Sequence, residues 1–311
     1  MDKLIWGLIK EVRPRQWIKN FAIFAGLLFY GYLDRVSYFQ TTFKAFIIFS
    51  GIASAVYLLN DCLDIESDRL HPFKKLRPIA SGLIPIPLAL TLSALLVITF
   101  LPLSFTIAPL FFAACLAYLI LQVSYCAFLK NVILLDVMTI ATGFVLRVYA
   151  GVWAIDAHLN VWFLLTVTSV ALFLAIGKRR SELTLLQSSA GAHRKTMLHY
   201  PENLLDIFTS MFANATWLTY AIFTFLQPPI SVPQTTYINI LNLITFPLVP
   251  AKYLMVTIPV VIYGVMRYLY IIYEKKQGES PERVLLTDRP LLISVVLWGT
   301  LVVTIIYYLG A

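Results

Sequence analysis

Charged residues are scarce in this sequence. Of its 311 residues, 13% are Asp, Glu, Lys or Arg and 59% are hydrophobic, whereas soluble domains carry about 25% charged and about 45–50% apolar residues. So few polar side chains cannot cover the surface of a chain of this length in water. The composition therefore excludes an ordinary soluble enzyme and predicts that lipid is the solvent for most of the chain.

Cysteine is scarce too. Cys62, Cys115 and Cys126 show no metal-ligand spacing, and an odd number without a CxxC pair gives no disulfide framework. We expect all three to be small buried residues. The basic N-terminus has no apolar stretch followed by a small-residue cleavage site, so no removable signal peptide is expected. Internal repeats, low-complexity tracts and linkers are also lacking, which predicts one domain over residues 1–311.

Long apolar runs are what the sequence does have. A helix that crosses a membrane needs about 20 mostly apolar residues, and continuous runs favour helices over the alternating strands of a barrel. The predicted fold is an all-α, polytopic membrane bundle of nine transmembrane helices. The predicted spans are residues 17–33, 42–63, 86–107, 109–129, 133–154, 160–177, 207–227, 251–273 and 289–309.

Lysine and arginine are distributed unevenly between the loops. If the N-terminus is cytoplasmic, most of the 24 lie on the cytoplasmic side, and only Arg35, Lys44 and Lys252 lie in loops on the opposite side. The positive-inside rule thus predicts a cytoplasmic N-terminus and an outside C-terminus. The net charge of +8 reflects this topology and is no evidence for a nucleic-acid partner. The cytoplasmic loops expected to form the active site are 64–85, 178–206 and 274–288.

An acidic cluster ends the second predicted span. Asp61, Asp64 and Asp68 are spaced i, i+3 and i+7, so they share one face of a helix, and Asn60 lies one turn before Asp64. Oxygen ligands without His or Cys suit Mg²⁺, which takes phosphate oxygens as remaining ligands. We predict that these four residues bind Mg²⁺–diphosphate, with the aspartates as catalytic residues. The alternative is a solvated helix end whose acids pair with Arg69, Lys74 and Arg77.

A basic stretch broken by prolines, HPFKKLRP (71–78), follows the acidic cluster. Lys74 and Arg77 are predicted to bind further phosphate oxygens, since arginine offers bidentate contacts. An ordinary positive-inside loop is the alternative.

A charged residue also lies deep in the fifth predicted span. Arg147 is costly there unless it is paired or faces a wet cavity, and Asp136 lies three turns earlier on the same face. Arg147 is predicted to line a polar substrate cavity. An interhelical ion pair that stabilises the bundle is the alternative.

The segment NDCLDIESD (60–68) fits the NDxxDxxxD pattern of the UbiA-type intramembrane prenyltransferase superfamily, and the chain resembles that superfamily over essentially its whole length. The resemblance implies nine transmembrane helices, with this motif binding Mg²⁺–diphosphate at the cytoplasmic end of the second. The chain is most similar to one branch, the decaprenyl-phosphate phosphoribosyltransferases. The matching segments are RPRQWIKN (13–20), NDCLDIESDRLHPFKKLRPIASG (60–82), LLDVMTIATGFVLRVYAG (134–151), GKRRSEL (177–183) and SPERVLLTDRP (280–290).

The loop after the sixth predicted span departs from the prenyl-transferring members of the superfamily. Those enzymes carry a second acidic motif, DxxxD, in this loop, whereas this chain has Lys178, Arg179 and Arg180, followed by Glu182. A basic patch suits a site whose two substrates both carry phosphate, so we predict that it binds a lipid phosphate. A generic membrane-surface anchor is the alternative.

The resemblance adds further substrate-binding candidates. A tyrosine–lysine pair recurs after the fourth helix of the superfamily, and Tyr125 and Lys130 occupy that place with a separation of five positions rather than four. Lys19, in the first matching segment, and Arg194, in the loop 178–206, complete the predicted set. Asp288 is expected to cap the last span or to form a local ion pair.

Together these features predict Mg²⁺-dependent transfer of 5-phosphoribosyl from 5-phosphoribosyl 1-diphosphate to a polyprenyl (decaprenyl) phosphate, for cell-envelope glycan precursors. The expected location is a bacterial cytoplasmic membrane, with membrane lipid around the chain, no nucleic-acid partner, and self-association left open. An aromatic prenyltransferase with a polyprenyl diphosphate donor is the first alternative, which the missing DxxxD motif disfavours. A transporter or lipid-binding protein is the second, although transporters place charges at the bilayer midplane.

Overall fold

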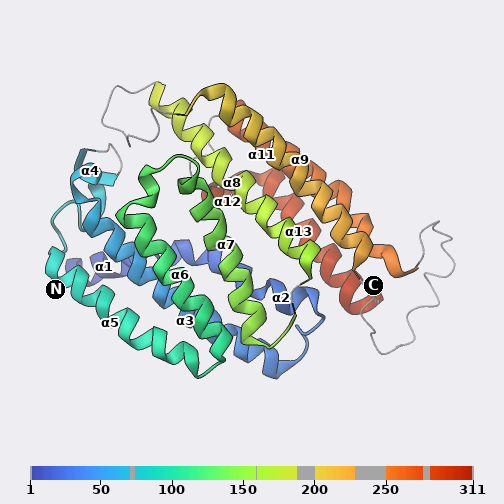
Figure 1. Ribbon diagram of the computed structural model, residues 1–311, viewed down its shortest axis with the longest axis horizontal. Helices are drawn as coiled ribbons and strands as arrows, with labels where there is room; N and C mark the ends of the chain where they lie inside the picture. The colour runs from blue at the N-terminus through green and yellow to red at the C-terminus, as the bar shows by residue number, and fades with distance from the viewer. Residues whose placement is uncertain are drawn as a thin grey trace.

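A computed structural model describes residues 2–70, 74–158, 160–187, 200–227, 250–275 and 281–309, and every regular element in these ranges is helical (Figure 1). The long helices are α3 (Val36–Leu63), α5 (Ile86–Phe105), α6 (Pro109–Ala127), α7 (Leu135–Ala154), α8 (Val161–Gln187), α9 (Glu202–Leu226), α11 (Ile258–Tyr273) and α13 (Arg289–Thr304). The shorter elements are α1 (Asp2–Glu11), η1 (Pro14–Ile23), α2 (Phe24–Phe29), α4 (Ile65–Leu70), η2 (Lys74–Leu76), η3 (Leu129–Asn131), η5 (Pro250–Thr257), α12 (Pro281–Thr287) and η6 (Ile305–Leu309).

The length and composition of these helices confirm the predicted all-α membrane class. Within the described residues, seven helices are long and apolar enough to cross a membrane: α3, α5, α6, α7, α8 and the helices that end at Tyr273 and Tyr308. The chain is an integral membrane protein. The count of nine spans and the orientation of the two termini stay predictions.

The first predicted span, residues 17–33, is not one continuous α-helix. Its first part belongs to the 3-10 helix η1, and α2 is only six residues long. Side chains hold η1 against α3: Asn20 Nδ2 donates to Ser50 Oγ at 2.9 Å, and Trp17 Nε1 donates to Ser54 Oγ at 3.0 Å. These tertiary hydrogen bonds fix an irregular backbone that an apolar run alone does not reveal.

Small residues allow close packing at two contacts of this region. A Cβ at Gly151 of α7 would overlap the carbonyl oxygen of Ile23, so the end of η1 packs against bare helix backbone. A Cβ at Gly51 of α3 would overlap the ring of Phe100 on α5. Close packing of this kind depends on glycine because any side chain would push the elements apart.

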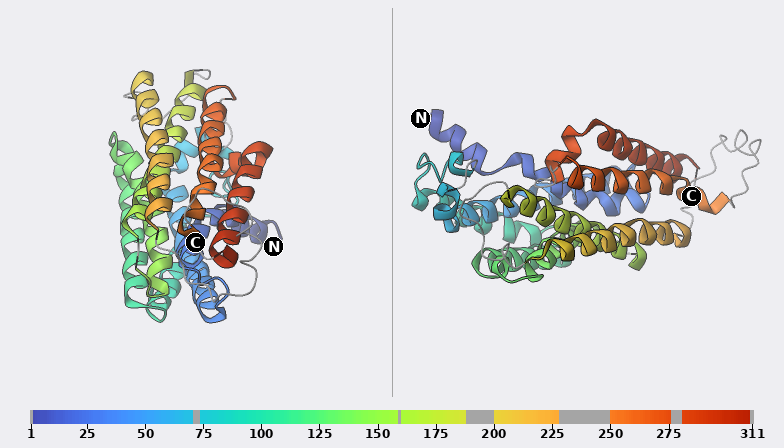
Figure 2. Two further views of the ribbon diagram at one scale, coloured as in Figure 1. Left: turned by 90° about the vertical axis from the view of Figure 1, so that its right-hand side faces the viewer. Right: turned by 90° about the horizontal axis from the view of Figure 1, so that it is seen from above.

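Two apolar cores lie on either side of α7. One contains Phe49 and Phe111, from α3 and α6, and the other contains Phe29 and Phe223, from α2 and α9. Helix α7 contributes to both, and it lies between the two groups of helices in Figure 1. Figure 2 shows the helices running side by side, with α1 and α4 at one end of the bundle and the C-terminus at the other. The acidic cluster lies at the α4 end.

Candidate functional site

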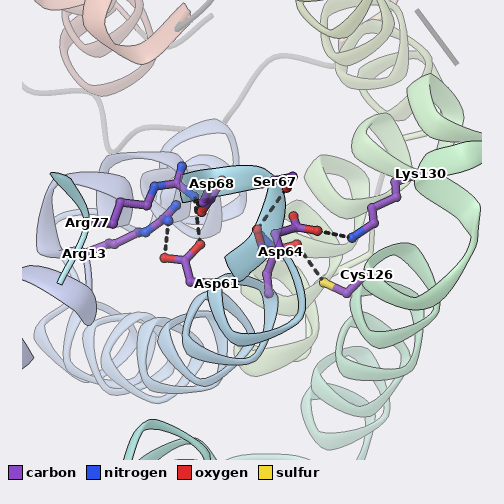
Figure 3. Close-up of polar contacts among 9 residues, drawn as sticks. Arg13, Asp61, Asp64, Ser67, Asp68, Arg77, Cys126 and Lys130 are labelled. Atoms are coloured by element: carbon purple, nitrogen blue, oxygen red, sulfur yellow. Dashed lines mark hydrogen bonds and ion pairs between the residues drawn. The ribbon is translucent and has the colours of Figure 1, made fainter. Parts of the chain in front are cut away.

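The acidic cluster spans a break between two helices. Helix α3 ends at Leu63, Asp64 follows with φ −93° and ψ 8°, and α4 begins at Ile65. As a result Asp61 and Asp68 face one way and Asp64 faces another, as Figure 3 shows. The expectation that the three aspartates share a face of one continuous helix is therefore wrong.

Two arginines from other segments neutralise Asp61 and Asp68. Arg77 Nη1 donates to Asp61 Oδ1 at 3.0 Å and to Asp68 Oδ2 at 2.5 Å, so one guanidinium bridges both carboxylates (Figure 3). Arg13 Nη2 donates to the other oxygen of Asp61. Asp61 is only 1% exposed, and a buried carboxylate is tolerated only with such partners.

A lysine from a different part of the bundle neutralises Asp64. Lys130 Nζ, on η3, lies 2.5 Å from Asp64 Oδ1. Beside it, Cys126 Sγ at the end of α6 donates to Asn60 Oδ1 at 3.2 Å. The motif thus meets η1, the loop after α4 and the α6–α7 connection at one end of the bundle. Acids do pair with cations, as the alternative interpretation held, but the cations come from three separate segments.

Glu11, at the end of α1, is a further acidic residue of the cluster. Its side chain is 2% exposed, and its Oε1 has no hydrogen-bond partner within the described residues. Burial, followed by the negative charge of Asp61, raises the pKa of Glu11 to about 7. Sequence reasoning missed Glu11 and Arg13 as site residues. The matching segment RPRQWIKN could have pointed to Arg13, whereas nothing in the sequence distinguishes Glu11.

The donor atoms of this cluster fit a magnesium ion that is held together with a substrate. Within the described ranges, no three His, Cys, Asp or Glu side chains converge closely enough to hold a metal by themselves. Mg²⁺, however, usually binds through one or two carboxylates and takes phosphate oxygens and water as other ligands. Asp61 and Asp68, which already share one cation in Arg77, offer such a pair of carboxylates.

The three basic residues predicted to open the loop 178–206 lie within α8 instead, because the helix continues to Gln187, and they do not form one patch. Arg179 is 1% exposed: its Nε lies 2.7 Å from Asp136 Oδ2, Nη1 pairs with Glu182, and Nη2 donates to Tyr125 OH at 3.2 Å. Tyr125 therefore contacts Arg179, while Lys130 contacts Asp64. The two carboxylates compensate the buried charge and tie α8 to α7, although Nε makes no hydrogen bond of good geometry within the described residues.

The neighbouring basic residues point elsewhere. Arg180 pairs with Glu202 at 2.6 Å and with Asp206 at 2.6 Å, so it joins α8 to α9. Lys178 is half-buried and lies 3.8 Å from Glu182, a long contact in a more open position. Of the three predicted phosphate-binding residues, only Lys178 is accessible without breaking a short ion pair.

Arg147 does not pair with Asp136. Its Nε donates to Asn20 Oδ1 at 2.8 Å, Nη1 to the Gly143 carbonyl at 2.6 Å and Nη2 to Tyr118 OH at 2.9 Å. These contacts hold η1 against α7 and α6, and the guanidinium also packs on the Tyr118 ring. The geometry favours a structural role, through neutral acceptors rather than the ion pair considered as the alternative.

The remaining candidates have mixed positions. Lys74 lies in η2, three residues before Arg77, and Lys19 is half-buried in η1 beside Asn20. Arg194 lies outside the described residues. Asp288 is the expected cap: its Oδ1 accepts from Leu291 N at 3.1 Å. It also pairs with Arg267 and Lys275, and the Arg267 hydrogen bond leads the contacts that hold the pKa of Asp288 below its usual range.

Comparison with known proteins identifies the family of the chain. Residues 20–286 match the UbiA prenyltransferase family. Proteins named decaprenyl-phosphate phosphoribosyltransferase are similar along nearly the whole chain. The one from Mycolicibacterium smegmatis is 33% identical over 98% of this chain and 94% of its own length, and the one from Corynebacterium glutamicum is 31% identical over 97% and 87%.

A solved structure shares the fold. A UbiA homolog from Archaeoglobus fulgidus, bound to GPP and Mg²⁺, superposes with a TM-score of 0.67 at 19% identity, covering 96% of this chain and 99% of the other. At that identity the likeness shows the fold alone. With the family match and relatives above 30% identity over most of their length, the chain belongs to the UbiA prenyltransferase family.

Proposed function

We propose that this protein transfers a 5-phosphoribosyl group from 5-phosphoribosyl 1-diphosphate to a polyprenyl phosphate such as decaprenyl phosphate. The observation that carries the proposal is the cluster of ion pairs between acidic and basic side chains at one end of the bundle. Asp61, Asp64 and Asp68 are each paired with Arg13, Arg77 or Lys130. The choice of donor and acceptor follows the names of the relatives that match the whole chain.

The charge balance of the cluster suits a metal–diphosphate ligand. Three aspartates pair with three cations, and Glu11 is a fourth acid beside them, so a carboxylate that loses its cation can take a metal and a cation that loses its carboxylate can take a phosphate. Phosphate oxygens of the donor replace the carboxylates on Arg13, Arg77 and Lys130, since charge-assisted hydrogen bonds to phosphate are strong. Asp61 and Asp68 are then available to hold Mg²⁺, which would neutralise the departing diphosphate. Asp64 and Asn60, on the side of the motif that faces Lys130 and Cys126, would contact the same Mg²⁺–diphosphate ligand from there.

The reaction needs positioning more than proton transfer. An oxygen of the acceptor phosphate forms a bond to C1 of the ribose, and the bond from C1 to the diphosphate oxygen breaks with its electron pair leaving on diphosphate. The acceptor phosphate is already ionised, so no general base is required. Lys178, which is accessible beside the buried Arg179, holds that phosphate, while the polyprenyl tail stays in lipid. Positioning and electrostatic stabilisation supply most of the rate.

The cellular setting follows from the distribution of basic residues along the chain. We place the site at the cytoplasmic surface of a bacterial inner membrane, where most lysines and arginines lie. The product would serve cell-envelope glycan synthesis.

A donor comparison tests the proposal. Purified protein in lipid nanodiscs is incubated either with decaprenyl phosphate and labelled phosphoribosyl diphosphate or with an aromatic acceptor and labelled geranyl diphosphate, each with Mg²⁺ or with EDTA. Mass spectrometry of the lipid product should show phosphoribosyl transfer that needs Mg²⁺. Asp64→Asn should abolish it, whereas Asp34→Asn, an exposed acid at the opposite end of the bundle, should not. Transfer from the prenyl donor instead would support an aromatic or lipid prenyltransferase.

A further inference from the structure

A strained turn links Lys130 to the start of α7. Leu134 has φ 67° and ψ −40°, one of three non-glycine residues with positive φ in the described part of the chain. Leu134 is 46% exposed, so packing of its side chain does not compensate for this backbone. A branched residue in this region is unfavourable and persists only when its surroundings hold it there.

The hydroxyl group of Tyr200 holds this turn. It accepts a hydrogen bond from Leu134 N at 2.7 Å and donates one to Asp136 Oδ1 at 2.8 Å. The ring is buried among Val137 and Ile176, so the hydroxyl has little freedom to move. Burial and the bond to Asp136 raise the pKa of Tyr200, which keeps the hydroxyl protonated and able to donate.

The same turn determines where Lys130 lies. The chain from η3 runs through hydrogen bonds from Val132 N to the Leu129 carbonyl at 3.1 Å and from Asp136 N to the Val132 carbonyl at 3.1 Å. Leu134 lies inside the turn that the second of these bonds closes. A change in the backbone angles of Leu134 would therefore displace η3, which holds Lys130 Nζ 2.5 Å from Asp64 Oδ1.

We infer that Tyr200 is a positioning residue: its hydroxyl holds the positive-φ turn at Leu134 so that Lys130 faces Asp64 in the diphosphate site. The inference rests on the proposed function for its kinetic part only. Tyr200 lies just before α9, and its hydroxyl bonds Leu134 and Asp136 rather than the acidic motif, so it acts through the turn.

The test removes the hydroxyl and then removes the strain. Tyr200→Phe should raise the KM for phosphoribosyl diphosphate about tenfold, the scale of one lost charge-assisted contact, with the KM for decaprenyl phosphate unchanged. Leu134→Gly tolerates positive φ without Tyr200, so it should restore the KM in the double variant. Lys130→Met should raise the same KM, and adding Tyr200→Phe to it should have no further effect.

A matched control and a second readout complete the test. Tyr273→Phe removes another tyrosine hydroxyl that donates to a carboxylate, Asp206 at 2.9 Å, and should leave the KM unchanged. Hydrogen exchange of the segment 129–138 should speed up in Tyr200→Phe and not in Tyr273→Phe, whichever donor the enzyme uses. Unchanged exchange, additive effects with Lys130→Met, or no rescue by Leu134→Gly would overturn the inference. A wild-type protein inactive on phosphoribosyl diphosphate would count against the proposed function alone, because the exchange comparison would still decide the role of Tyr200.

Discussion

Arg179 and Asp136 form an ion pair inside the bundle, with Nε 2.7 Å from Oδ2 and both side chains about 2% exposed. The pair joins α8 to α7. Glu182 and Tyr125 complete the environment of the guanidinium. The arginine that the sequence suggested for substrate phosphate is thus part of the structure that supports the site.

We predict that Asp136→Asn destabilises the protein. Removing one partner of a buried ion pair costs about 3–5 kcal/mol when the other charge is left unpaired. Arg179 keeps Glu182 as a partner, so the cost should be smaller and the Tm in detergent should fall by about 5 °C. Differential scanning fluorimetry measures this directly. Lys178→Gln, next to Arg179 but half-buried, is the matched control and should change the Tm little. Equal Tm values for Asp136→Asn and wild type would show that the pair is not needed.

The sequence predicts the helices better than the site. Apolar runs identify α5 and α6 closely, because proline marks the first turn of each and the runs are uninterrupted. The run 17–33 misleads because Asn20 and Trp17 bind α3 side chains and hold a 3-10 helix. Side-chain pairing with another segment has no local signal.

The motif itself is visible in the sequence, but its partners are not. Spacing tells which residues share a helix face, yet Lys130 and Asp64 are 66 positions apart and meet only through the packing of α6 on α3. The helix break at Asp64 is equally hidden, since no proline or glycine precedes it. A run of basic residues also cannot show that Arg179 is buried while Lys178 is accessible.

Arg77 should be sensitive even to a conservative change. Arg77→Lys keeps the charge, but it removes the other N–H groups of the guanidinium, which stay available for phosphate oxygens while Nη1 bridges Asp61 and Asp68. We expect the KM for the diphosphate donor to rise about tenfold with a smaller change in Tm. Arg69→Lys is the control, because Arg69 Nε donates to the Ala80 carbonyl at 3.2 Å rather than to a carboxylate of the motif. Similar steady-state constants for both variants would contradict a specific role for Arg77.

Arg147 should matter for stability and not for donor affinity. Arg147→Met keeps an apolar stem but leaves Asn20 Oδ1 and the Gly143 carbonyl without their donor. Unsatisfied buried acceptors cost about 1–3 kcal/mol each, so the Tm should fall by several degrees while the KM for the donor stays the same. A double variant with Asn20→Ala should be less than additive, since the two residues share one contact. A raised KM in folded Arg147→Met would instead place Arg147 in the substrate site.

Glu11 should make stability depend on pH. Its pKa is about 7 in the folded protein and near the ordinary 4.5 in the unfolded chain. As the pH rises, the unfolded chain loses the Glu11 proton before the folded protein does. Protonated Glu11 therefore contributes a stability that is fully present below pH 4.5 and is lost as the pH rises through 7. Glu11→Gln cannot lose a proton, and its Tm relative to wild type should be about 2–4 °C higher at pH 8 than at pH 5. Scanning fluorimetry in EDTA, with the exposed Glu66→Gln as control, gives the comparison. The same Tm difference at both pH values would show that the Glu11 carboxyl does not titrate beside Asp61.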